Sequence, residues 1–202
     1  MTSAALVTIE ELGDIPPPPP ARPRVLLVAT VLASAATVMG FAALVAVYLS
    51  ERATTIAETG AWFDGNTIPL TPGNMSLVGF ALSLVFMHWA VDAIGKDDRR
   101  HTWMAFGAVL MVGAFHFVGT GFLYFQSGFA VATPQGALVY AVTGAHLAIT
   151  GAGLLFAALM AFRTLGGQYS AKDREGVVAA TVFWWVVALT YGVLWYAIYV
   201  TK

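Results

Sequence analysis

Three residues are the first candidates for a chemical role in this sequence, because they are ionisable and lie within long apolar stretches. They are His88, His116 and His146. An imidazole can bind a metal, carry a proton or form hydrogen bonds, so such residues are candidates for all three roles. The sequence contains no cysteine, which excludes disulfides, thiolate metal sites, iron–sulfur clusters and cysteine nucleophiles. Any metal would therefore need histidine and carboxylate ligands.

The composition places these histidines in a membrane protein. Hydrophobic residues make up 58% of the 202 residues and charged residues only 10%, against about 25% charged residues in soluble domains. The net charge of −1 and the lack of a basic arm give no indication of nucleic-acid binding. We therefore expect an integral membrane protein.

Five apolar segments are long enough to cross a hydrocarbon core about 30 Å thick, and they cover residues 25–49, 73–95, 103–125, 136–162 and 177–200. Backbone groups in lipid have no water to bond, so these segments must be helices. The prediction is an all-α, polytopic bundle of five transmembrane helices over residues 25–202. Residues 1–24 form a proline-rich tail, which we interpret as a cytoplasmic spacer, with a docking strip as the alternative.

Lysine and arginine predict the orientation of the bundle. Arg52 and Lys202 lie on one side of the predicted membrane. The other side has eight basic residues: Arg22, Arg24, Lys96, Arg99, Arg100, Arg163, Lys172 and Arg174. Basic residues favour the cytoplasmic side, so the N-terminus is predicted to be cytoplasmic and the C-terminus outside.

Ionisable groups are scarce inside the predicted helices. Asp92 lies near a helix end, where it can pair with Lys96, and no aspartate, glutamate or lysine occupies the middle of a helix. A small ion-coupled transporter would be expected to have such a charge or a broken helix. The pattern therefore speaks against a transporter.

His116 and His146 are predicted to lie at similar depth, because each is about ten residues from the outer end of its helix and the two helices are antiparallel. Two interpretations stay open. The pair can clamp a haem, as in a small cytochrome b-like electron carrier, or form hydrogen bonds between helices. His88 lies nearer the other face of the membrane.

Small residues surround His146. Gly144, Ala148 and Ala152 recur at every fourth position, which predicts close approach of a neighbouring helix. In the last segment, Trp184 and Trp185 lie deep and are expected to pack against protein, whereas the aromatics near its outer end suit the membrane interface.

Several motifs, in the same order along residues 25–201, resemble one family. TGAH at residues 143–146 is followed by Gly153 and Arg163, and the last segment reads FWWVVALTYGVLWYAIY. ATVMGFAALVAVYL at residues 36–49 and DRRH at residues 98–101 complete the pattern. It is similar to cytochrome c oxidase subunit III of haem-copper oxidases, in a short five-helix form that lacks the first two helices of the seven-helix form. Polar positions of the family are replaced by Thr37, Leu123, Ile149, Trp185 and Ala188.

This resemblance implies a non-catalytic subunit of a terminal oxidase, with no catalytic residue and no metal in this chain. Haem and copper would belong to two partners, the core subunit and the copper-bearing subunit. The resemblance implies a bound phospholipid at Arg163, with Gln168 beside it. Helix packing or an interface is the role we expect for these residues: His88, His116, Gly144, His146, Ala148, Gly153, Trp184 and Trp185. An accessory subunit of a nitric oxide reductase is the alternative within the same resemblance.

Overall fold

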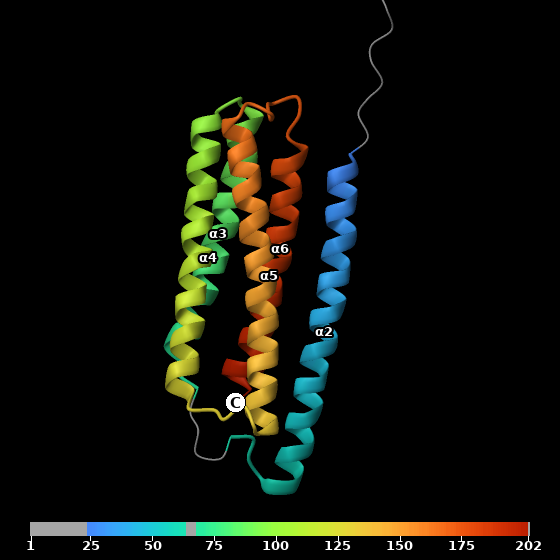
Figure 1. Cartoon of the computed structure of the whole chain (residues 1–202), viewed down its shortest axis with the longest axis vertical. Helices are drawn as coiled ribbons and strands as arrows, with labels where there is room; N and C mark the ends of the chain where they lie inside the picture. The colour runs from blue at the N-terminus through green and yellow to red at the C-terminus, as the bar shows by residue number, and fades with distance from the viewer. Residues whose placement is uncertain (1–23, 64–67, 202) are drawn as a thin grey trace, which may run out of the picture.

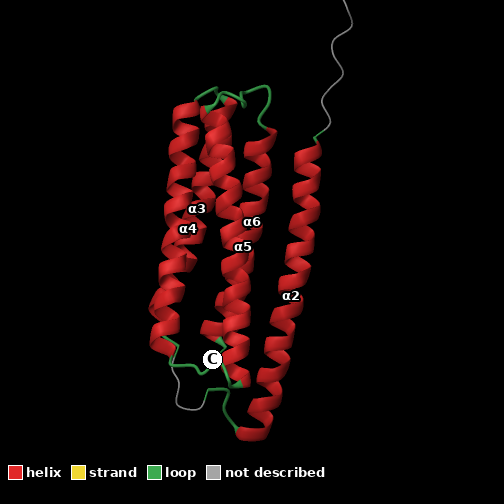
Figure 2. Ribbon diagram, viewed as in Figure 1, coloured by secondary structure: helices red, strands yellow, loops and turns green. Residues whose placement is uncertain are grey.

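The computed structural model of the chain describes residues 24–63 and 68–201, and all regular structure in these residues is helical (Figure 2). Five helices are long and apolar enough to cross a membrane. They are α2 (Val25–Thr59), α3 (Leu70–Gly95), α4 (Arg99–Ser127), α5 (Pro134–Leu165) and α6 (Glu175–Trp195), and α6 continues into the short π-helix η1 (Tyr196–Val200). The predicted all-α bundle of five membrane-type helices is confirmed. The predicted tail lies outside the described residues, apart from Arg24.

The helix ends follow local chemistry. Asp98 caps α4, because its side chain accepts a hydrogen bond from the His101 backbone N–H, and Thr133 caps α5 through Gly136 N–H. The predicted end of the first helix at residue 49 is wrong, since α2 is 35 residues long and ends at Thr59. The added stretch SERATTIAET is polar, so no hydropathy signal marks it, yet its Glu, Arg and Ala residues favour helix.

Four of the helices form an antiparallel bundle in which α3 packs against α4, α4 against α5, α5 against α6, and α6 against α3. α2 lies outside this bundle and packs on α6 and α5 (Figure 1). α2 is therefore the least buried of the five helices.

The end of the bundle that carries the N-terminus of α2 is held by polar contacts. Glu175 Oε1 accepts a hydrogen bond from the Leu27 backbone N–H at 2.8 Å, which joins α6 to the first turn of α2. Asp97 Oδ1 accepts a hydrogen bond from Ala171 N–H at 2.7 Å and so joins the two loops at this end. The predicted pair of Asp92 and Lys96 is confirmed, with 2.6 Å between Oδ2 and Nζ.

The opposite end is closed by aromatic side chains. Trp62 is buried, and its indole Nε1–H donates to the Tyr48 hydroxyl at 3.0 Å. Phe63 packs on Phe129 with ring centroids 4.8 Å apart. The structure buries Trp62 against α2, where Tyr48 supplies an acceptor for its N–H.

Candidate functional site

The centre of the bundle contains a hydrogen-bonded chain that crosses four helices. His146 Nδ1 on α5 lies 3.2 Å from His116 Nε2 on α4. His116 Nδ1 lies 3.2 Å from Ser76 Oγ on α3, and His146 Nε2 lies 3.0 Å from the Val187 carbonyl oxygen on α6. We call these four groups the histidine network. The equal depth predicted for the two histidines is confirmed by their direct contact.

One direction of donation uses all three contacts when both rings are uncharged, and Thr150 Oγ1, 3.4 Å from His146 Nδ1, can also donate to that nitrogen. The Val187 carbonyl can only accept, so His146 Nε2 carries the hydrogen and His146 Nδ1 is an acceptor. His116 Nε2 must then donate to it, which leaves His116 Nδ1 to accept from the Ser76 hydroxyl. Each ring therefore has a fixed tautomer, and every ring nitrogen has a partner.

Aromatic rings enclose the two histidines. His146 is completely buried and His116 is 4% exposed. Phe80 contacts both rings with centroids 5.0 and 5.6 Å away, and Tyr191 does so at 5.0 and 5.2 Å. Phe41 brings α2 into the cluster through an edge contact with His146 at 5.9 Å. All five helices therefore meet at this point.

This geometry does not fit a haem between the histidines. Two axial imidazoles must each direct a nitrogen at the iron from opposite faces of the ring system. Here the two facing nitrogens are 3.2 Å apart, and His146 Nε2 is bonded to a backbone carbonyl. The rings of Phe80 and Tyr191 occupy the adjacent space. Within the described residues there is also no group of three or more metal-ligating side chains.

Gly153 and Trp184 bring α5 and α6 together beside the network. A Cβ atom on Gly153 would lie 3.0 Å from Val187 Cγ2 and 3.2 Å from the Trp184 ring, so glycine permits this close approach. Trp184 is fully buried, and its Nε1–H donates to Ser83 Oγ on α3 at 2.8 Å. Both predicted packing residues thus lie at helix contacts.

The predicted small-residue face of α5 is a different face. Ala148 is exposed, and no atom lies within 4 Å of a Cβ built on Gly144. Ala148 follows His146 by two residues, which is about 200° around the helix. Gly144 and Ala148 therefore do not lie at a helix contact within this chain, where the buried face follows His146, Thr150 and Gly153. Their role in packing or at an interface stays a prediction.

His88 and Trp185 also lie on the outside of the bundle. His88 is exposed and Trp185 is 39% exposed, and their rings form an edge contact with centroids 5.8 Å apart. We expected Trp185 to be covered by protein, but it follows buried Trp184 directly and so points about 100° away from it.

Arg163 and Gln168 contact each other at the end of α5. Arg163 Nε donates to Gln168 Oε1 at 2.6 Å, and the guanidinium carbon lies 5.6 Å from the centre of the Tyr169 ring. Burial raises the pKa of the Tyr169 hydroxyl, which donates to Met160 Sδ at 3.2 Å. Among the described residues only Gln168 accepts a hydrogen bond from this guanidinium, so its two Nη groups stay available to an anion.

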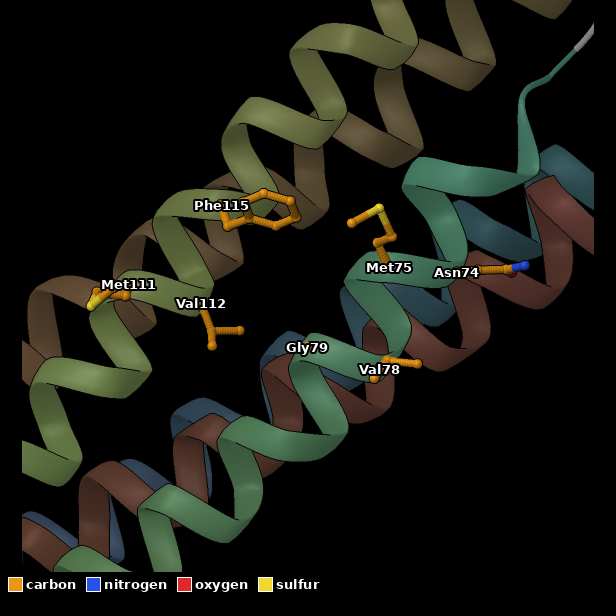
Figure 3. Close-up of a pocket in the computed structure, with 7 residues that line it drawn as sticks. All are labelled: Asn74, Met75, Val78, Gly79, Met111, Val112 and Phe115. Atoms are coloured by element: carbon orange, nitrogen blue, oxygen red, sulfur yellow. The ribbon is translucent and has the colours of Figure 1, made fainter.

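An apolar groove lies between α3 and α4 (Figure 3). Its lining is Asn74, Met75, Val78, Gly79, Met111, Val112 and Phe115. The Asn74 side chain points away from the groove in Figure 3, and its Oδ1 accepts from Trp195 Nε1–H at 2.8 Å. The groove therefore offers only van der Waals contact, and we assign no ligand to it.

Sequence reasoning missed two members of the histidine network. Ser76 is a single hydroxyl in an apolar segment, and Val187 takes part through its backbone. Ser76 follows the start of α3 by only six residues, yet the His116 side chain reaches it. A polar residue near the depth of a buried histidine is the one signal that could have indicated it.

Comparison with known proteins supports the family resemblance. No family model matches the chain. The chain is similar to proteins named cytochrome c oxidase subunit 3, with 25% identity over 158 residues for that of Salmo salar, covering 76% of this chain and 60% of the relative. For Strongylocentrotus purpuratus the identity is 25% over 163 residues, covering 79% and 63%. The chain thus spans about three fifths of the length of these relatives.

A bacterial relative matches more completely. The cytochrome c oxidase subunit 3 of Corynebacterium diphtheriae is 24% identical over 185 residues, which cover 89% of this chain and 88% of that protein. Similarity at about 25% identity over most of the chain supports the resemblance to cytochrome c oxidase subunit III, and the five long apolar helices are those of a multi-pass membrane protein.

Proposed function

We propose that this chain is a non-catalytic transmembrane subunit of subunit III type in a haem-copper terminal oxidase of a bacterial plasma membrane. The observation that carries the proposal is the match to the bacterial relative, which covers 89% of this chain and 88% of that protein. The five membrane-type helices agree with it. Haem and copper belong, in this proposal, to the core subunit and the copper-bearing subunit.

The histidine network supports a stabilising role for the chain. It links α3, α4, α5 and α6 at the middle of the bundle, and all its ring nitrogens are used in protein contacts. Hydrogen bonds between membrane helices contribute about 0.6 kcal/mol on average and up to about 2. Three such bonds in a row fix the relative positions of the helices, and a fixed bundle presents a constant surface to the core subunit.

A second part of the proposal is a phospholipid at Arg163. The bond from Nε to Gln168 fixes the plane of the guanidinium and leaves the Nη donors paired for two phosphate oxygens. Arg163 is exposed at the end of α5, and the helix is apolar up to this residue. We also propose that this end of the bundle faces the cytoplasm and that the tail at residues 1–24 is a spacer there.

Purification of the tagged full-length chain from its native membranes in mild detergent tests the function. Mass spectrometry should identify a haem-copper core subunit and a copper-bearing subunit, and the absorption bands of haem should follow those partners when the complex is dissociated. A nitric oxide reductase core among the partners would support the alternative assignment. A haem band that stays with the isolated chain would overturn the proposal in favour of an electron carrier.

A further inference from the structure

The exposed ring of His88 has an acceptor that the protein does not use. His88 Nδ1 lies 2.8 Å from the Leu84 carbonyl oxygen, which can only accept, so Nδ1 carries the hydrogen. In an uncharged imidazole, Nε2 is then a bare acceptor. No described residue donates a hydrogen bond to it.

This acceptor lies at the depth of the hydrocarbon. His88 precedes the end of α3 at Gly95 by seven residues, or about 10 Å. Side chains on a helix lean toward its N-terminus, and the contact with Leu84 shows that the ring lies deeper still. Acyl chains offer no donor at this depth, so an unpaired acceptor there is unfavourable.

Trp185 adds an unused donor beside it. Its ring lies 5.8 Å from that of His88, at an interplanar angle of 88°. Three other tryptophans each donate their indole N–H to a defined acceptor: Trp62, Trp184 and Trp195. Trp185 Nε1–H has no acceptor among the described residues and is 39% exposed. A ring with an unused acceptor and a ring with an unused donor therefore lie next to each other on an apolar outer face.

We propose that the surface formed by His88 and Trp185 docks a transmembrane helix of a partner protein. That helix presents a side chain that donates to His88 Nε2 and accepts from Trp185 Nε1–H, which means a hydroxyl or a carboxamide. Val85 and Leu189, 61% and 60% exposed, provide apolar contact on either side. The inference deepens the proposed function, because it names the face that meets another subunit, but its chemistry requires only a membrane-spanning partner.

Retention of partner chains tests the surface. His88→Leu removes the acceptor, Trp185→Phe removes the donor, and His88→Gln keeps an acceptor on a side chain of similar length. Val118→Leu, on the exposed outer face of α4, is the matched control. Loss of one hydrogen bond worth about 1 kcal/mol lowers partner retention about fivefold, so we expect this for His88→Leu and Trp185→Phe. His88→Gln and the control should retain the partner as the parent does.

A photoreactive benzophenone side chain at Leu189 identifies what covers this face in native membranes. We expect a cross-link to another membrane polypeptide, and none from the same probe at Val118. A cross-link to lipid only, or to a second copy of this chain, overturns the inference, as does unchanged retention in His88→Leu. If the cross-linked partner is not an oxidase subunit, the docking surface is supported and the proposed function is contradicted. If all variants retain oxidase subunits equally, the proposed function is supported and the docking surface is contradicted.

Discussion

His146 and His88 occur in similar apolar sequence, yet the structure uses them in opposite ways. His146 is completely buried, with both ring nitrogens bonded to other helices. His88 is exposed and bonds only to the carbonyl of its own helix, one turn away. The residue type is the same, so the face of the helix decides whether an imidazole joins helices of one chain or is left for a partner.

The same contrast separates the two ways in which a membrane bundle uses hydrogen bonds. A bond such as that from His146 to Val187 acts within the chain and contributes to its free energy of unfolding. An unused acceptor such as His88 Nε2 contributes nothing to the isolated chain and acts only on assembly. Substitutions at the two positions should therefore affect different measurements.

His146→Leu should give the largest effect. It removes the contacts of the ring with His116, Val187 and Thr150 and leaves the buried His116 N–H without an acceptor, which costs about 1–3 kcal/mol for each unsatisfied group. We expect a loss of about 2–4 kcal/mol in the free energy of unfolding of the purified chain in detergent, measured by helical circular dichroism. His88→Leu is the matched control and should stay within about 0.5 kcal/mol of the parent. Equal losses in both variants would show that the buried and the exposed histidine contribute alike to folding.

In the assembled complex, His146→Ala should weaken retention of this chain without removing any haem band. The reason is that both ring nitrogens of His146 are bonded within the protein. Absorption spectra of parent and variant complexes, normalised to the core subunit, check this. Loss of a haem band from an otherwise intact assembly would contradict it.

The two faces of α5 offer a second comparison. Gly153→Leu places a side chain against Trp184 and Val187, and overpacking of this kind costs about 1–3 kcal/mol. Ala148→Leu adds the same bulk on the exposed face and should change the free energy of unfolding by less than about 0.5 kcal/mol. Chemical unfolding of the two variants in the same detergent measures the difference. A larger loss in Ala148→Leu would show that the predicted face is the packed one after all.

This face is where sequence reasoning reached its limit. Helix number followed from apolar length, and the contact of His116 with His146 followed from matched depth. The buried face of α5 was missed because the prediction followed the small residues. Thr143, His146 and Thr150 recur at spacings of three and four, and this polar periodicity marks the face that the structure buries. The extension of α2 to Thr59 was missed because it lies in polar sequence, where hydropathy gives no signal.

Arg163 allows a test of geometry against charge. Arg163→Lys keeps the positive charge but removes the paired donors that Gln168 holds in one plane. We expect loss of a bound phospholipid from the complex by native mass spectrometry, with no change in assembly. Lys172→Arg, in the following loop, is a control that adds a guanidinium elsewhere. If Arg163→Lys retains the same lipid as the parent, Arg163 serves only as a basic residue at the membrane boundary.

The smallest effect is expected at His101, whose ring and backbone contact an acid outside the apolar region. The His101 backbone N–H, and then its ring, donate to Asp98 and hold the pKa of this carboxyl below 3.8. Since the folded pKa of Asp98 lies below the unfolded one, the stabilising contribution of this carboxylate is complete above pH 3.8 and is lost as pH falls through the folded pKa.

Hydrogen exchange of the first-turn amides of α4 measures this contribution. After correction for intrinsic rates, these amides should lose protection only in strong acid. Asp98→Asn keeps a capping oxygen that does not titrate, so its protection should not vary with pH. If parent and Asp98→Asn lose protection in parallel, the carboxylate is not the group that titrates, and the cap acts through geometry alone.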